Sequence, residues 1–191
     1  TNATNCVDWF ISNIGMTPGD PRAYDELGNA AFGSDQSKAP LFLPFIFGER
    51  CPGWQEDRTG GFFGVTPGHG RGSLYYSVLE GILFNMYQCY GILEGLAGPP
   101  SRIVVSGGIT RSSGWMQLAA DIFGLELETT GSANDSTVGA ALVALSGLEG
   151  KASVEPPEEG PSAVYTPITR NREALMERYG RYVRMYESTK P

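Results

Sequence analysis

A short strand, a pair of glycines and the start of a helix follow one another in the middle of the chain, and this run constrains the fold more than any other segment. The β-branched residues over 102–105 predict a strand. Gly107 and Gly108 have no Cβ, so the backbone there can turn sharply and approach another group closely. Ser112 and Ser113 are residue types that favour a helix N-cap. The segment therefore predicts a strand, a turn and a helix in succession.

Helices and strands alternate on either side of this turn. Upstream, the pattern of apolar residues predicts helices over 5–14, 22–32 and 73–96, extended segments over 41–47 and 60–65, and a structured loop over 48–59. Downstream, it predicts helices over 113–123, 137–148 and 171–186, a strand over 125–129 and a short extended segment at 164–165. Turns or loops are expected over 131–135 and 150–162. This alternation predicts an α/β fold with at least some parallel strand pairing.

The composition is that of an ordinary globular domain. The chain has 191 residues, of which 41% are hydrophobic and 18% charged, so one large domain with a packed core is expected. The net charge of −7 argues against a nucleic acid or an anionic membrane as a partner, because both attract clustered positive charge. The sequence has no apolar run of membrane-spanning length and no signal peptide, so we expect a cytoplasmic protein.

Candidate metal ligands and disulfides are few. Cys6, Cys51 and Cys89 are an odd number of cysteines, and neither they nor the single histidine, His69, have the spacing of a metal site. No metal site is therefore assigned to the chain, and the cysteines are expected to be reduced thiols rather than a disulfide framework.

The glycine turn is the best candidate for binding chemistry. A helix that begins just after it would offer free N–H groups and the positive end of its dipole to an anionic ligand such as a nucleotide phosphate. The local pattern is neither a P-loop, because no Lys stands at the required spacing, nor the dinucleotide fingerprint Gly-x-Gly-x-x-Gly. Two interpretations stay open on these residues alone, a nucleotide seat and a glycine that only turns the chain.

The acidic residues of the loop at 48–59 are a weaker candidate. Glu49, Glu56 and Asp57 could form a pair of catalytic carboxylates, but each has Arg50 or Arg58 close by in the sequence. Ion pairing or solvation is therefore expected for them rather than catalysis.

Short motifs follow one another in order along almost the whole chain. The first are Phe42-Leu-Pro-Phe, Gly48-Glu-Arg-Cys-Pro-Gly-Trp54 and Arg58-Thr-Gly-Gly-Phe-Phe-Gly-Val-Thr66. The next are His69-x-Arg71, Val78-Leu-Glu-Gly81, Ser106-Gly-Gly, Trp115-x-Gln117, Ala120-Asp-Ile-Phe-Gly124 and Ser136-Thr-Val-Gly-Ala-Ala141. As an ordered set they resemble the C-terminal domain of the FGGY family of carbohydrate kinases, in the xylulokinase and gluconokinase branches.

This resemblance implies an actin-like, ribonuclease H-like α/β lobe, in which a mixed sheet is flanked by helices. Residues 1–191 would form the nucleotide-holding C-terminal lobe of a two-lobed kinase, with residues 1–40 as a helical lead-in between the lobes. Such kinases transfer the γ-phosphoryl group of ATP to a sugar hydroxyl with the help of Mg²⁺. The implied substrates are a ketopentose, an aldonate or a related polyol, and the resemblance leaves a homodimer open.

Site residues are carried over by position in the motifs. The residues expected at the nucleotide are Gly107, Gly108, Arg111, Ser112, Thr4 and Asp8. The glycines are expected against the ribose and phosphates, and Ser112 near the adenine or ribose. Thr4 and Asp8 align, through the position of Trp9, with a polar segment near the phosphates.

The same resemblance implies that the chain is part of a longer protein. The family's N-terminal lobe carries the first phosphate loop, most sugar contacts and the catalytic Asp, so no catalytic residue is assigned to this chain, which we expect to be inactive alone. Cys51 departs from the family pattern, which often has Ala or Thr after Gly-Glu-Arg. The alternative function is a non-catalytic, actin-like module for nucleotide binding or interaction.

Overall fold

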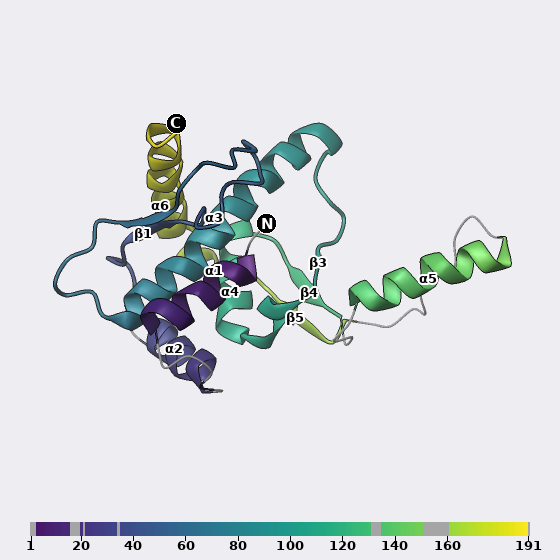
Figure 1. Cartoon of the computed structure of the whole chain (residues 1–191), viewed down its shortest axis with the longest axis horizontal. Coiled ribbons are helices and arrows are strands. Elements are labelled where there is room, and N and C mark those ends of the chain that lie inside the picture. The colour runs from purple at the N-terminus through teal and green to yellow at the C-terminus, as the bar shows by residue number, and fades with distance from the viewer. Residues whose placement is uncertain are drawn as a thin grey trace.

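The structure is a computed structural model that describes residues 3–15, 20, 22–33, 35–130, 135–150 and 161–190. The helices are α1 (Ala3–Phe10), η1 (Ile11–Gly15), α2 (Ala23–Phe32), α3 (Arg71–Ala97), η2 (Gly108–Arg111), α4 (Ser113–Phe123), α5 (Asp135–Glu149) and α6 (Thr169–Ser188). The strands are β1 (Leu41–Leu43), β2 (Gly61–Phe63), β3 (Val104–Val105), β4 (Leu127–Thr129) and β5 (Ala163–Tyr165). Figure 1 shows helices around short strands, in agreement with the predicted α/β class.

Two small sheets contain these strands. β1 and β2 pair antiparallel, whereas β3 pairs parallel to β4 and β4 pairs antiparallel to β5. The parallel pair confirms the pairing that the helix and strand alternation predicts, and β5 makes the sheet mixed. The strands are shorter than the sequence pattern predicts. β1 ends at Leu43 because Pro44 has no N–H with which to extend the ladder.

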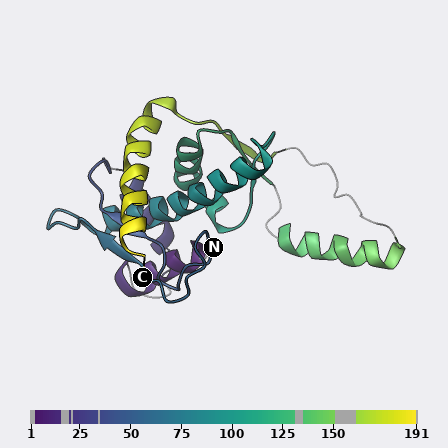
Figure 2. The same cartoon turned by 90° about the horizontal axis from the view of Figure 1, so that it is seen from above.

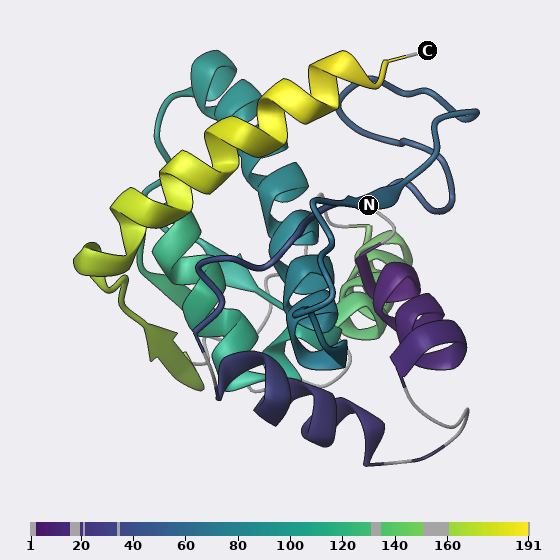
Figure 3. The same cartoon turned by 90° about the vertical axis from the view of Figure 1, so that its left-hand side faces the viewer.

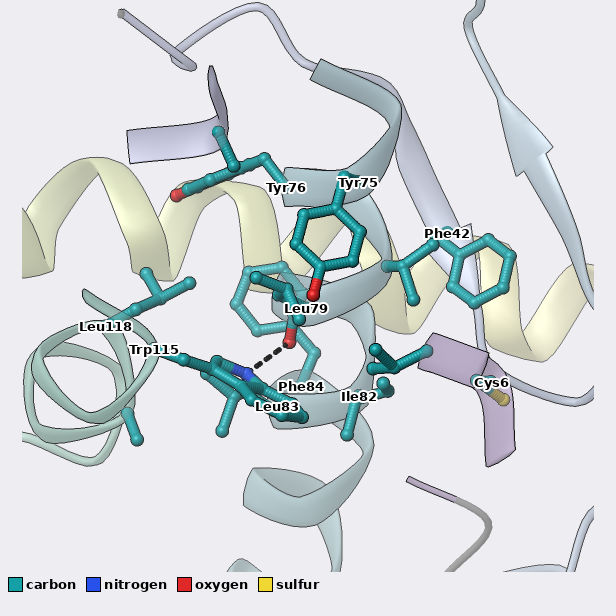
Figure 4. Packing of buried hydrophobic residues seen from close by; sticks show 14 of the residues in the cluster. Cys6, Phe42, Tyr75, Tyr76, Leu79, Ile82, Leu83, Phe84, Trp115 and Leu118 are labelled. Carbon is teal, nitrogen blue, oxygen red and sulfur yellow. Dashed lines mark hydrogen bonds between the residues drawn. The ribbon is translucent and has the colours of Figure 1, made fainter. Parts of the chain in front are cut away.

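Helix α3 is the centre of the fold. Its first half is buried over Tyr75 to Asn85, whereas the residues from Gly91 onward are exposed. Gly81 lets the helix lie directly against β1, since a Cβ at this position would stand 2.2 Å from the carbonyl oxygen of Phe42. On another face α3 meets α4, where the indole N–H of Trp115 donates to the carbonyl oxygen of Leu79 at 3.2 Å (Figure 4). The helix also contacts α1 and α6, so it joins both ends of the chain to one core.

Helix α6 closes the core from the C-terminal side, where it crosses α3 as the long yellow helix in Figure 3. Arg178 on α6 donates to both carboxylate oxygens of Glu80 on α3, at 2.7 and 2.6 Å. Both side chains are almost completely buried. Arg178 also donates to the carbonyl oxygen of Ala39, so one side chain ties α6 to two other segments.

The loop before β2 is held by a second buried ion pair. Arg58 donates to a carboxylate oxygen of Glu49 at 3.0 Å, and Tyr186 on α6 donates to the other oxygen at 2.5 Å. At the surface, Arg50 and Glu56 approach to 3.8 Å. The prediction of ion pairing for Glu49 and Glu56 is therefore confirmed.

Helix α5 lies apart from the other elements in Figures 1 and 2. The segments on its two sides, 131–134 and 151–160, lie outside the described residues, and so do most of the turn and loop predicted there. Among the described residues, no helix has the length and apolar character needed to cross a membrane.

Candidate functional site

A pocket of about 370 Å³ opens where α1, α2 and α3 meet the turn that leads into α4. Its volume lies in the range of small-molecule sites, which begins near 300 Å³. Four of the six site residues predicted from the sequence line it, namely Thr4, Gly108, Arg111 and Ser112. Two segments that are far apart in the sequence therefore converge on one cavity.

The glycine turn has different requirements at its two positions. Gly107 adopts φ +89° and ψ −163°, a combination open almost only to glycine. Its carbonyl oxygen accepts from both the N–H and the hydroxyl of Thr110, at 3.1 and 2.8 Å, which closes the turn. A Cβ at Gly108 would stand 3.8 Å from the side chain of Thr4, an ordinary contact across the pocket. Gly107 shapes the turn without lining the pocket, and Gly108 faces into it.

Ser112 is the N-cap of α4, as its residue type predicts. Its hydroxyl oxygen accepts from the N–H of Trp115 at 3.3 Å. A serine hydroxyl also has a proton to donate, so Ser112 can cap the helix and bind a ligand at the same time. Ser113 and Gly114 line the pocket as well, and the first N–H groups of a helix have no intrahelical acceptor. This wall can therefore bind an anion.

Arg111 and Asp8 occupy different places. Arg111, the last residue of η2, is exposed and lines the pocket, where its guanidinium supplies positive charge. Asp8 does not line the pocket. Its carboxylate accepts from the hydroxyl of Tyr24 at 2.6 Å, and this hydrogen bond raises the pKa of Tyr24 above its ordinary value. Asp8 thus holds Tyr24, which itself lines the pocket.

Helix α2 forms a wall that the sequence reasoning missed. Tyr24, Asp25, Gly28, Asn29 and Phe32 line the pocket from one side of this helix. The opposite side carries buried small and aliphatic residues, Ala23, Leu27 and Ala31. The available signal was the amphipathic pattern over 22–32, which leaves two aromatic residues, Tyr24 and Phe32, on the less buried side. An aromatic residue there favours a binding surface.

Helices α2 and α4 approach each other closely where both line the pocket. A Cβ at Gly114 would stand 2.6 Å from the ring of Phe32, so only glycine lets the two helices come this near. Phe32 also packs edge-on against Tyr76, with the ring centroids 6.0 Å apart. The position of the Phe32 ring against α4 therefore depends on this glycine.

Solved structures of carbohydrate kinases have a similar fold. The xylulose kinase of Rhodospirillum rubrum superposes with a TM-score of 0.79 at 23% identity, over 97% of this chain and 38% of that one. The Plasmodium falciparum glycerol kinase, solved with ADP, superposes with a TM-score of 0.74 at 22% identity, over 99% and 37%. At these identities the similarity establishes the fold, which is the actin-like α/β fold expected from the motifs.

Carbohydrate kinases are also similar to this chain in sequence. The chain is 39% identical to a gluconokinase of Bacillus licheniformis over 106 residues, which are 55% of this chain and 21% of that protein. It is 28% identical to a xylulose kinase of Staphylococcus epidermidis over 191 residues, 98% of this chain and 38% of that one. The chain thus spans about two-fifths or less of these relatives. Residues 1–148 match the model of the C-terminal domain of the FGGY carbohydrate kinases, and the chain belongs to this family.

Proposed function

We propose that this chain is the nucleotide-holding lobe of an ATP-dependent carbohydrate kinase, which transfers the γ-phosphoryl group of ATP to a sugar hydroxyl. One observation carries the proposal. The pocket gathers Thr4, Gly108, Arg111 and Ser112, which the family motifs assign to nucleotide binding, around one cavity of suitable size. Family membership supports the activity of the whole protein.

Each wall of the pocket has a distinct role in this proposal. Backbone at Gly108 lies against the ribose and phosphates, where no Cβ intervenes, and Gly107 holds the turn that presents it. Ser112 donates its hydroxyl proton to the nucleoside, and the guanidinium of Arg111 offsets phosphate charge. Thr4 faces Gly108 across the pocket, and Asp8 orients Tyr24. The α2 wall, with Phe32 and Asn29, encloses the base.

The described residues provide little for a metal ion. Nowhere among them do three His, Cys, Asp or Glu side chains come together. Mg²⁺ commonly binds through substrate phosphates, its own waters and one or two carboxylates. We therefore propose that Mg²⁺ enters with the nucleotide phosphates, and it would neutralise their charge during transfer. Among the residues that line the pocket, Asp25 is the one with a carboxylate that could act as such a ligand.

The sugar and the proton acceptor are proposed to lie in a second lobe, preceding this one in the whole protein. A carboxylate there would accept the hydroxyl proton of the sugar. The relatives are named gluconokinase, xylulose kinase and glycerol kinase, which favours a ketopentose, an aldonate or a related polyol as the substrate. The lobe boundaries at 1–191, the lead-in over 1–40, a cytoplasmic location and a homodimer also stay proposals.

Replacement of Gly108 tests the nucleotide site. In the full-length enzyme, Gly108→Val places a branched side chain in the pocket opposite Thr4, and we expect kcat/KM for ATP to fall about tenfold or more. The KM for the sugar should stay close to that of the parent enzyme. Steady-state kinetics with each substrate varied in turn measures both values.

The matched control is Gly91→Val on the exposed part of α3, where a Cβ would meet nothing within 4 Å. This variant should leave both KM values unchanged. An unchanged ATP KM in Gly108→Val would remove Gly108 from the site. The alternative, a non-catalytic module, is favoured if the full-length protein binds ATP but releases no ADP with any sugar of a broad panel.

A further inference from the structure

Two cysteines that are 38 positions apart lie side by side on the surface. Cys51 is in the loop before β2, Cys89 is on α3, and their sulfur atoms are 3.1 Å apart. Cys51 is exposed and Cys89 half-buried, whereas the third thiol, Cys6, is completely buried. Neither Cys51 nor Cys89 lines the pocket described above.

The backbone around the two thiols is already held in place. The side-chain amide of Asn85 on α3 donates to the carbonyl oxygen of Cys51 at 3.0 Å. Asn85 and Cys89 are four positions apart, so they lie on the same face of the helix. On its other side, the loop is fixed by the carboxylate of Glu49, which accepts from the N–H of Gly53 at 2.7 Å. A disulfide has its sulfurs about 2.05 Å apart, so bond formation needs a sulfur movement of about 1 Å rather than a new fold.

The two thiols differ in a way that suits a sequential reaction. The thiol of Cys89 donates its hydrogen to the sulfur of Cys51. Burial, with the neighbouring sulfur, raises the pKa of Cys89 to about 12, which keeps this thiol protonated at neutral pH. Because peroxide reacts with the thiolate, Cys89 is a poor first target for oxidation. Cys51 is the exposed partner and therefore the one that a small oxidant in solution can reach.

We propose that Cys51 and Cys89 form a peroxide-sensitive dithiol, a modification site in which Cys51 is oxidised first and Cys89 resolves it to a disulfide. The Cys51 sulfur attacks one oxygen of hydrogen peroxide, the O–O bond breaks, and sulfenic acid and water form. The Cys89 sulfur then displaces the hydroxyl from the Cys51 sulfur, and its proton leaves with that hydroxyl as a second water. In sum, two thiols and one peroxide give one disulfide and two waters. The product covalently joins the loop to α3.

Peptide mapping of the full chain tests this assignment. After treatment with graded hydrogen peroxide, free thiols are blocked with iodoacetamide and the protein is digested with trypsin without reductant. Cleavage after arginine gives separate peptides for the three cysteines, at 1–22, 51–58 and 72–102. We expect the peptides 51–58 and 72–102 to be linked, with the loss of two hydrogens, and the peptide 1–22 to carry no link. Dithiothreitol should separate the linked pair.

Variants give the control. Cys51→Ser and Cys89→Ser should each abolish the linked species, whereas Cys6→Ser should keep it, because serine can donate to the Pro44 carbonyl oxygen as Cys6 does. The result on the unaltered chain stands even if a variant folds poorly. The proposal is overturned if Cys51 oxidises to sulfinic acid while Cys89 is fully alkylated, or if Cys51 links to a second chain instead.

Discussion

At the scale of single residues, the two adjacent glycines of the turn have different structural roles. Gly107 is needed for its backbone conformation, which closes the turn through Thr110. Gly108 has no such requirement and faces Thr4 across the pocket. One position therefore supports the shape of the site, and the other keeps space for a ligand.

This division predicts unequal losses of stability when each glycine is replaced by alanine. Gly107→Ala should lower the free energy of unfolding by about 1–3 kcal/mol, because alanine rarely adopts φ +89° with an extended ψ. Gly108→Ala should change stability much less, since its Cβ would make only an ordinary contact at 3.8 Å. Urea unfolding followed by circular dichroism measures both. Equal losses in the two variants would contradict the assignment.

At the scale of elements, α3 and α6 are joined by a charge pair inside the core. Burial raises the pKa of Glu80, and the two hydrogen bonds from Arg178 oppose that shift and favour the ionised carboxylate. A buried pair of this kind adds little net stability compared with apolar residues, but the loss of one partner strands a charge. The packing of α6 on α3 therefore depends on both residues being present.

Replacement of Arg178 alone should strongly destabilise the fold. Arg178→Met leaves Glu80 in the core without its partner, and we expect the free energy of unfolding to fall by about 3–5 kcal/mol. The double variant Glu80→Met/Arg178→Met should recover most of the loss. Arg102→Met is the matched control, because Arg102 pairs with Glu128 at the surface, where an ion pair contributes little. Denaturant midpoints compare the three, and a double variant no more stable than Arg178→Met would refute the argument.

At the scale of the whole molecule, protonated phenols and thiols in the core predict a loss of stability at alkaline pH. Burial raises the pKa of Cys6 to about 11 and that of Tyr75 to about 12, and it raises the pKa of Tyr76 and Tyr182 still further. In an unfolded chain these groups lose their protons at about pH 8.5 for Cys and 10 for Tyr. From about pH 8.5 upward the folded state therefore binds more protons than the unfolded state, so the free energy of unfolding falls as the pH rises.

We therefore expect the urea midpoint to be steady near neutral pH and to fall above about pH 9. Tyr182→Phe should weaken this fall, since it removes one such group. At neutral pH the variant should be as stable as the parent or more so, because the buried hydroxyl of Tyr182 has no hydrogen-bond partner among the described residues. Urea midpoints measured across the pH range test this prediction, and a midpoint that stays constant to about pH 11 would contradict the expected loss of stability.

Local sequence signals determined the order of helices and strands, the cap at Ser112 and the glycine turn, because each depends on residues within one or two turns of one another. The family motifs extended this to the fold and to four residues that line the pocket. The place of α2 beside the turn, the role of Asp8 beside Tyr24 and the meeting of Cys51 with Cys89 were decided by the tertiary structure. These features join segments far apart in the chain, and no local pattern specifies which distant face a side chain will meet. Such contacts form only when the core around α3 brings the segments together.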